Sequence, residues 1–90
     1  KGEDKMAITK STEIGQMEVV GKYKAIQVRT DTVIKEDGTE ISRKYHRHVI
    51  WPNISDSDLA NEHADVQLLA KSGIWTDQIK SDYAAYVASL

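Results

Sequence analysis

The sequence predicts an α+β domain: a three-stranded antiparallel β-meander followed by two C-terminal helices packed on it. Residues 12–51 are rich in β-branched side chains and contain an Asp-Gly pair, which is typical of a β-hairpin. After Pro52 the apolar residues recur with a helical period. The 90 residues and 40% hydrophobic content are those of one small globular domain.

The domain is expected to span residues 9–90, after a flexible N-terminal tail over residues 1–8. The first five residues, Lys1 to Lys5, contain no apolar side chain that would anchor them. A first strand is expected over residues 12–20 and a second over residues 23–35. Gly21 and Lys22 are expected to form a two-residue turn between them, because glycine tolerates positive φ.

The Asp37-Gly38 pair predicts a type I′ turn and fixes the pairing of the second and third strands. The third strand is expected over residues 40–51, ending at Pro52, which has no backbone N–H for a ladder. A simple two-residue turn aligns Ile34 with Ile41 and Thr30 with Tyr45. One face then collects most apolar side chains and Tyr45, with Met17 opposite Ile26. The other face holds Arg29, Asp31, His46 and His48.

The C-terminal third predicts two amphipathic helices. Ser55 is a good N-cap for the first, and Gly73 is suited to its C-terminal end. Thr76 is the expected N-cap of the second. The apolar face of the first comprises Leu59, His63, Val66, Leu69 and Ala70, and that of the second comprises Ile79, Tyr83, Tyr86, Val87 and Leu90. Ala60, Ala64 and Leu68 form a further stripe, covered by the second helix or by another subunit, with the former preferred.

The composition excludes several classes of protein. There is no cysteine, so no disulfide or thiolate ligand is available. No apolar run approaches the roughly 20 residues that cross a bilayer, so a soluble protein without membrane association is expected. Residues 1–54 contain ten Lys and Arg against eight Asp and Glu, whereas residues 55–90 contain two against six. This weak asymmetry permits anion binding or attraction between neighbouring copies.

His46 and His48 are the sharpest candidates for a binding site. Residues two apart on a strand point to the same side, so both imidazoles are able to reach one metal ion or anion. A zinc site needs a third protein ligand, such as His63, and the spacing does not supply one. We therefore favour the interpretation that His46 and His48 are polar residues of the strand and bind no ligand.

The hairpin over residues 22–51 is basic, which suggests nucleic acid as an alternative partner. Arg29, Lys44 and Arg47 are the candidate contacts to an anion or a phosphate backbone. Four carboxylates offset much of the charge, and Tyr45 is expected on the apolar face rather than available for stacking. We therefore favour the interpretation that the charges of this hairpin keep a strand edge solvated and prevent aggregation, over the interpretation that they bind nucleic acid.

No enzyme is expected. The sequence contains no catalytic cysteine, no nucleophile elbow and no glycine-rich phosphate loop, and its carboxylates are scattered. No catalytic residue and no cofactor are therefore assigned.

Four segments carry a resemblance to a protein family, namely Met6 to Glu13, Val28 to Ser42, His46 to Val49 and Ile74 to Thr76. Together they resemble a group of small proteins encoded by tailed bacteriophages of marine bacteria, cyanophages among them. The group has no established activity. The resemblance implies a phage setting, in which small α+β domains serve in the virion, in assembly or as accessory proteins.

The sequence thus predicts a non-enzymatic structural or interaction protein of a phage. It is expected to act as a homo-oligomer or on a phage partner, in the virion or in the cytoplasm of the infected host. Nucleic-acid binding by the basic hairpin and metal binding by His46 and His48 are the two alternatives.

Overall fold

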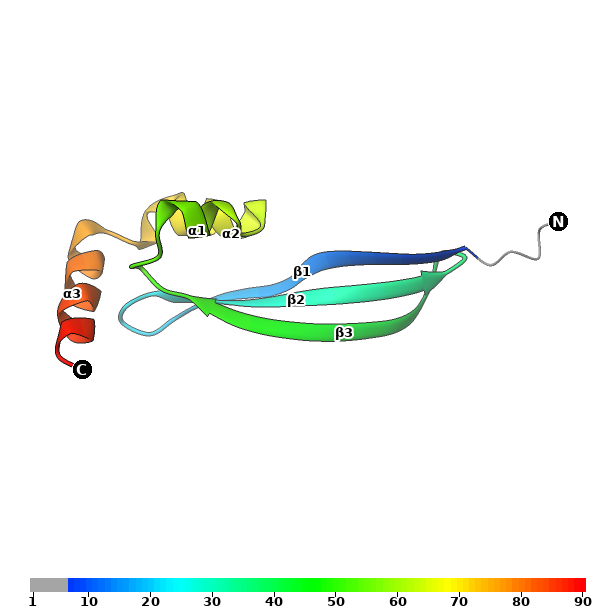
Figure 1. The fold of residues 1–90 in the computed structure, drawn as a ribbon, viewed down its shortest axis with the longest axis horizontal. Helices are drawn as coiled ribbons and strands as arrows, with labels where there is room; N and C mark the ends of the chain where they lie inside the picture. Colours follow the sequence, from blue (N-terminus) through cyan, green and yellow to red (C-terminus); the bar gives the residue numbers. More distant parts are fainter. Residues whose placement is uncertain (1–6) are drawn as a thin grey trace.

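A computed structural model describes residues 7–90 and has three antiparallel strands followed by helices (Figure 1). The strands are β1 (Ile8–Val20), β2 (Ala25–Glu36) and β3 (Thr39–Ile50), in the sheet order β1-β2-β3. This confirms the predicted α+β meander. Of the tail expected over residues 1–8, residues 1–6 lie outside the described part, and Ile8 already belongs to β1.

The two turns differ in how well the sequence predicted them. Asp37 and Gly38 have φ angles of 52° and 85°, as the predicted type I′ turn requires. The loop between β1 and β2 has four residues, 21–24, because Val20 pairs with Ala25. The Lys24 amide donates a hydrogen bond to the Gly21 carbonyl at 3.2 Å. The expected two-residue turn at Gly21 and Lys22 is therefore wrong.

A β-bulge at Ile41 changes the register between β2 and β3. The first pairs after the turn, Lys35 with Glu40 and Glu36 with Thr39, follow the expected alignment. Beyond the bulge Ile34 lies opposite Ser42, not opposite Ile41. One extra residue on β3 moves every later side chain of this strand to the other face of the sheet. The predicted division of β3 between an apolar and a polar face is therefore wrong.

A second bulge, at Gly15, interrupts the pairing of β1 with β2. Ile14 pairs with Thr30, whereas Gln16 pairs with the next residue, Arg29. Met17 lies opposite Val28 rather than opposite Ile26. Because Val28 and Ile26 are two residues apart on one strand, Met17 is still on the expected face.

The helical region is α1 (Asp56–Ala60), α2 (Ala64–Leu69), the π-helical turn η1 (Ala70–Ile74) and α3 (Asp77–Ala88). The predicted N-caps are confirmed, because the Ser55 and Thr76 hydroxyls each accept an amide hydrogen bond at 3.1 Å. Gly73 has the expected positive φ, 102°. The single first helix is wrong: the chain breaks after Ala60, and His63 begins α2 by accepting the Asp65 amide on Nδ1 at 3.0 Å.

The core lies between one face of the sheet and the segment from α1 to η1 (Figure 1). We call the face of the sheet that these helices cover the helix-side face. The buried residues of the core are Ile26, Val28 and Ile50 from the sheet and Leu59, Val66, Ala70 and Trp75 from the helical region. The Trp75 indole also donates a hydrogen bond to the Lys24 carbonyl at 2.7 Å, which ties the helical region to the β1–β2 loop. Ala60, Ala64 and Leu68 are exposed, so the preferred intramolecular cover of that stripe is wrong.

Helix α3 was expected to pack on the sheet, but it lies beyond the end of the sheet (Figure 1). It is held there by aromatic contacts. Tyr83 stacks on Trp51 with ring centroids 5.2 Å apart, and Tyr23 contacts both Tyr83 and Tyr86. The face near this end is already covered by η1 and Trp75, which leaves α3 only the end of the sheet.

The molecule is elongated, measuring 63 × 20 × 18 Å. Its radius of gyration is 18.1 Å, compared with about 12 Å for a compact chain of this length. The helices cover only the part of the sheet near the β1–β2 loop, and the half that ends at the Asp37-Gly38 turn extends without them (Figure 1). No helix within residues 7–90 is long and apolar enough to span a bilayer.

Candidate functional site

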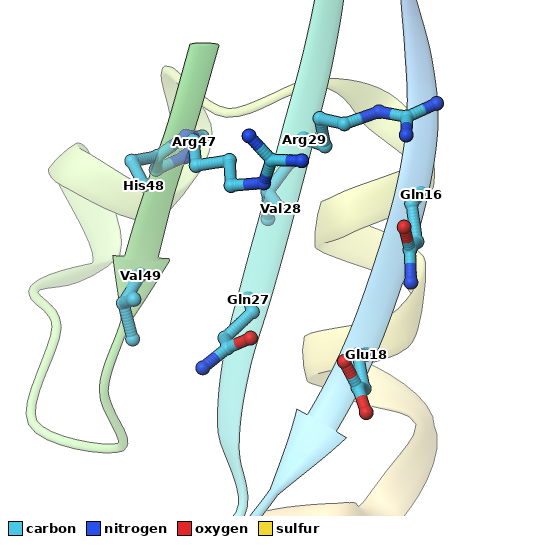
Figure 2. A pocket seen from close by; sticks show the side chains of 8 residues that line it. All are labelled: Gln16, Glu18, Gln27, Val28, Arg29, Arg47, His48 and Val49. Carbon is cyan, nitrogen blue, oxygen red and sulfur yellow. The ribbon is translucent and has the colours of Figure 1, made fainter. Parts of the chain in front are cut away.

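The strongest concentration of polar chemistry lies on the sheet face opposite the helices, which we call the open face. Figure 2 views this face with the helices behind the strands. The register assigns to it side chains from all three strands: Glu13, Gln16, Glu18, Gln27, Arg29, Asp31, Arg43, Tyr45, Arg47 and Val49. Because of the bulge at Ile41, this set includes Tyr45, which the sequence analysis placed on the apolar face.

Asp31 is at the centre of the open face and is completely buried. Arg29 donates to both carboxylate oxygens at 2.9 and 3.1 Å, and Arg43 donates to Oδ2 at 2.7 Å. Burial acts to raise the pKa of Asp31, but the hydrogen bonds and positive charges of the two arginines outweigh it and hold the pKa below its ordinary value. Asp31 is therefore an anion at neutral pH, fully engaged by its partners.

Arg43 extends this network toward the end of the sheet that carries the Asp37-Gly38 turn, which we call the turn end. Arg43 also donates to both oxygens of Glu40, at 2.7 and 2.9 Å. This hydrogen bonding lowers the pKa of Glu40 and raises the pKa of Arg43. Glu13 lies 3.7 Å from the same guanidinium. Arg43 thus connects carboxylates from β1, β2 and β3.

The bulge at Gly15 provides the space for Asp31. A Cβ atom at position 15 would overlap the Asp31 carboxyl group. Because that carboxyl group is held by two arginines, it has no freedom to move aside. Gly15 is thus required by a close approach rather than by its own φ angle.

Tyr45 lies between two arginines on the open face. The guanidinium carbon of Arg29 is 4.6 Å from the centre of the Tyr45 ring, and that of Arg47 is 6.0 Å away. Both distances are those of cation–π contacts. Within residues 7–90 no carboxylate lies within ion-pair distance of Arg47, whereas Arg29 is paired with Asp31.

A groove runs over the open face beside these arginines (Figure 2). Arg47 reaches from β3 over β2, and Arg29 reaches from β2 toward β1 (Figure 2). The amides of Gln16 and Gln27 and the carboxylate of Glu18 complete its polar lining. Amide, guanidinium and carboxylate groups in one groove are suited to polar contacts with another chain, but they include no nucleophile beside a base.

The three residues predicted to contact an anion are divided between the two faces. Arg29 and Arg47 pair directly across β2 and β3, so the structure brings them together. Lys44 pairs with Thr32 and lies on the helix-side face. Since Asp31 neutralises Arg29, Arg47 is the main positive charge of the groove.

His46 and His48 share one face as predicted, with ring centroids 6.1 Å apart. However, they pair with Thr30 and Val28, so they lie on the helix-side face and not with Arg29 and Asp31. The expected common face is wrong, and the bulge at Ile41 is the reason.

His48 joins the sheet to the helical region. Its Nε2 atom lies 2.7 Å from Oε1 of Glu62, which is in the break between α1 and α2. His46 and His63 line a cleft beside this contact, together with His48 and Glu62. Among the described side chains, no three from His, Asp and Glu are arranged to hold a metal ion.

Tyr45 was predicted on the wrong face, whereas Gln27 lies on the predicted face with Arg29 and Asp31. Gln16 and Gln27 were not predicted as residues of a site. The face of Tyr45 depends on the bulge at Ile41, and the residue type at this position does not indicate a bulge. At Gly15 the glycine within a strand is itself a signal for a bulge.

Comparison with known proteins identifies no relative. No family model, no curated protein and no solved structure matches the chain.

Proposed function

We propose that this chain is a non-enzymatic interaction protein that works as a homo-oligomer, in the virion or in the cytoplasm of a phage-infected host. The elongated shape supports this proposal most strongly. A single copy of 63 × 20 × 18 Å leaves half of a three-stranded sheet without helices on either face. Such a sheet is stabilised when another chain covers or extends it. The resemblance to phage proteins supports the setting.

Exposed apolar side chains in the helical region and near the Asp37-Gly38 turn support the same proposal. Leu90 and Leu68 are 85% and 70% exposed, and Ile8 and Ile41 at the turn end are 57% and 54% exposed. Single exposed apolar residues are ordinary on monomers. Here they accompany an extended shape and unpaired strand edges, a combination that favours contacts between copies.

The solution mass tests the proposal. Light scattering coupled to size exclusion, from micromolar to near-millimolar protein, is expected to give a multiple of the 10.1 kDa chain mass. A mass of one chain at every concentration contradicts a homo-oligomer.

Nucleic-acid binding through the hairpin over residues 22–51 is a second candidate. The observation that favours it is the presence of Tyr45 beside Arg29 and Arg47 on an uncovered face. Pairing of Arg29 and Arg43 with Asp31 weakens it, because those charges are already neutralised.

Titration with labelled single-stranded and double-stranded DNA at two salt concentrations tests this candidate. Binding should weaken with salt and be reduced by Arg47→Ala. Lys71→Ala, in η1, is the matched control. Equal affinity of both variants, or no binding at low salt, contradicts a nucleic-acid partner.

A further inference from the structure

We propose that copies of this chain assemble by edge-to-edge strand pairing, in which β1 of one copy lies beside β3 of the next. The inference rests on the proposed homo-oligomer and specifies its interface. It concerns the two strand edges between the Asp37-Gly38 turn and Arg47, namely residues 8–14 of β1 and 42–47 of β3. Only the inner ends of these segments, at Ile14 and His46, border the helical region. The occupant of each edge is a second copy of the same chain.

Both outer strands present unpaired backbone groups. In the order β1-β2-β3, only β2 has a neighbour on each side. β1 has 13 residues and β3 has 12, so the two edges match in length. Within residues 7–90, the loop and turn backbone hydrogen bonds do not involve residues 8–20 or 39–50. Neither strand contains proline, and the bulges at Gly15 and Ile41 leave residues 8–14 of β1 and 42–50 of β3 regular. Long regular edges are templates for further pairing, so this proposal departs from the aggregation-resistant edge that was expected from the mixed charges of the hairpin.

The charges of the two edges differ in sign. β3 contains Arg43, Lys44 and Arg47 against the single acid Glu40. β1 contains Glu13 and Glu18 against the single base Lys10. Pairing β3 with β3 would bring arginines and lysine opposite one another, which destabilises a sheet. Pairing β1 with β3 brings together opposite charges.

The strand register places the acidic residue Glu13 of β1 level with the basic residues of β3 along the strand direction. Glu13 pairs with Asp31, and Asp31 pairs with Tyr45, so Glu13 and Tyr45 lie level across the sheet. Arg43 and Arg47 flank Tyr45 on the same face of β3. If the next copy is added side by side with its strands in the same direction, its Glu13 lies between these two arginines. The Glu13 side chain is 55% exposed and lies 3.7 Å from Arg43 of its own copy, so the contact that it gains in the assembly is with Arg47 of the next copy, which has no carboxylate partner among residues 7–90.

This pairing is heterologous, since each copy offers a different edge to each neighbour. Repetition of such a contact gives a closed ring or an open filament, depending on the rotation between copies. The sheet continues from copy to copy, and the open faces of successive copies lie side by side.

A charge exchange tests the pairing. Glu13→Lys places a lysine beside Arg47 of the next copy, and Arg47→Glu places a glutamate beside Glu13 of the next copy. Because like charges repel, each variant alone should have the mass of a single chain. In an equimolar mixture, the lysine introduced into β1 of one variant meets the glutamate introduced into β3 of the other, and assembly should return. Asp77→Lys and Lys80→Glu on α3 make the same changes of charge away from both edges and should retain the wild-type mass.

The outcomes separate this inference from the proposed function. If the wild-type chain is a single copy at all concentrations, both fail. If it is an oligomer and both edge variants keep its mass, the homo-oligomer stands and the β1–β3 pairing is wrong. If the mixture fails to reassemble while each variant is folded by circular dichroism, the heterologous arrangement is wrong. Glu13→Gln and Arg47→Gln, which remove one charge each, provide the test should a reversed charge prevent folding.

Discussion

Asp31 is a buried carboxylate on a sheet face that no helix covers, and its burial has a local origin. The bulge at Gly15 opens a space on β1, and the guanidinium groups of Arg29 and Arg43 close over the carboxylate from β2 and β3. A buried charge is tolerated only when it is paired and hydrogen-bonded in this way. The network therefore depends on one residue without a side chain.

Replacement of Gly15 by alanine should destabilise the fold. The new methyl group would overlap the Asp31 carboxyl group, and overpacking of this kind costs about 1–3 kcal/mol. Urea unfolding of Gly15→Ala measures the loss. The neighbouring exposed change Gln16→Ala should alter the free energy of unfolding by less than about 0.5 kcal/mol. Equal stability of the two variants would show that the space at Gly15 is not needed.

Acid should destabilise the protein through Asp31 and Glu40. Their pKa values are lowered in the folded state, so between those values and the ordinary ones near 4 the unfolded chain binds more protons. Their contribution is present at neutral pH and is lost progressively below about pH 5. Urea unfolding from pH 7 to pH 3 should show the decline. In Arg43→Gln, which removes a shared partner, the decline should be smaller; an unchanged slope contradicts this account.

At the scale of elements, the sequence predicted the strands, the Asp37-Gly38 turn and the helix caps. Each depends on residues close in sequence: an Asp-Gly pair, Ser55 and Thr76. It did not predict the face of the sheet on which Tyr45, His46 and His48 lie. That face depends on whether one residue, Ile41, is accommodated as a bulge, and a β-branched residue is equally suited to a regular strand.

The position of α3 also depends on information that is not local. Of the apolar face predicted for it, Tyr83 is buried and Ile79 half-buried, whereas Tyr86, Val87 and Leu90 are exposed. An apolar stripe in the sequence does not specify the partner that covers it. Trp75 and η1 occupy the sheet near the β1–β2 loop, so Tyr83 packs on Trp51 at the end of the sheet. Competition between elements for one small sheet decided the outcome.

The two faces of α2 should respond very differently to truncation. Val66 is completely buried in the core, whereas Leu68 is 70% exposed. Val66→Ala should cost about 2 kcal/mol, from lost burial and a residual cavity. Leu68→Ala should be within about 0.5 kcal/mol of the wild-type chain when both are unfolded in urea at the same low protein concentration. Similar losses at both positions would contradict the packing of α2.

At the scale of the whole molecule, the chain divides into a packed end and an extended end. The core uses Ile26, Val28 and Ile50, which lie near the helices, and the hairpin beyond Thr30 contributes little to it. Residues of the extended end are therefore stabilised chiefly by strand pairing, by the Asp31 network and by the buried side chain of Val33. An assembly that pairs these edges adds stability where a single copy has least.

The melting temperature should consequently rise with protein concentration. Binding between folded copies that is absent in unfolded chains stabilises the fold by mass action. Differential scanning calorimetry over a hundredfold range of concentration is expected to show the rise for the wild-type chain. Glu13→Lys should melt at one temperature throughout. A concentration-independent wild-type melt contradicts assembly of the folded state.

The hydrogen bond from Trp75 to the Lys24 carbonyl gives the protein a natural optical probe. It links residues that are 51 positions apart, so it forms only when the helical region meets the first hairpin. Trp75 is 8% exposed and Trp51 is 41% exposed, so a water-borne quencher reaches the second tryptophan more readily than the first. With Trp51→Phe, the remaining indole emission follows the meeting of these two regions during refolding, without any attached dye.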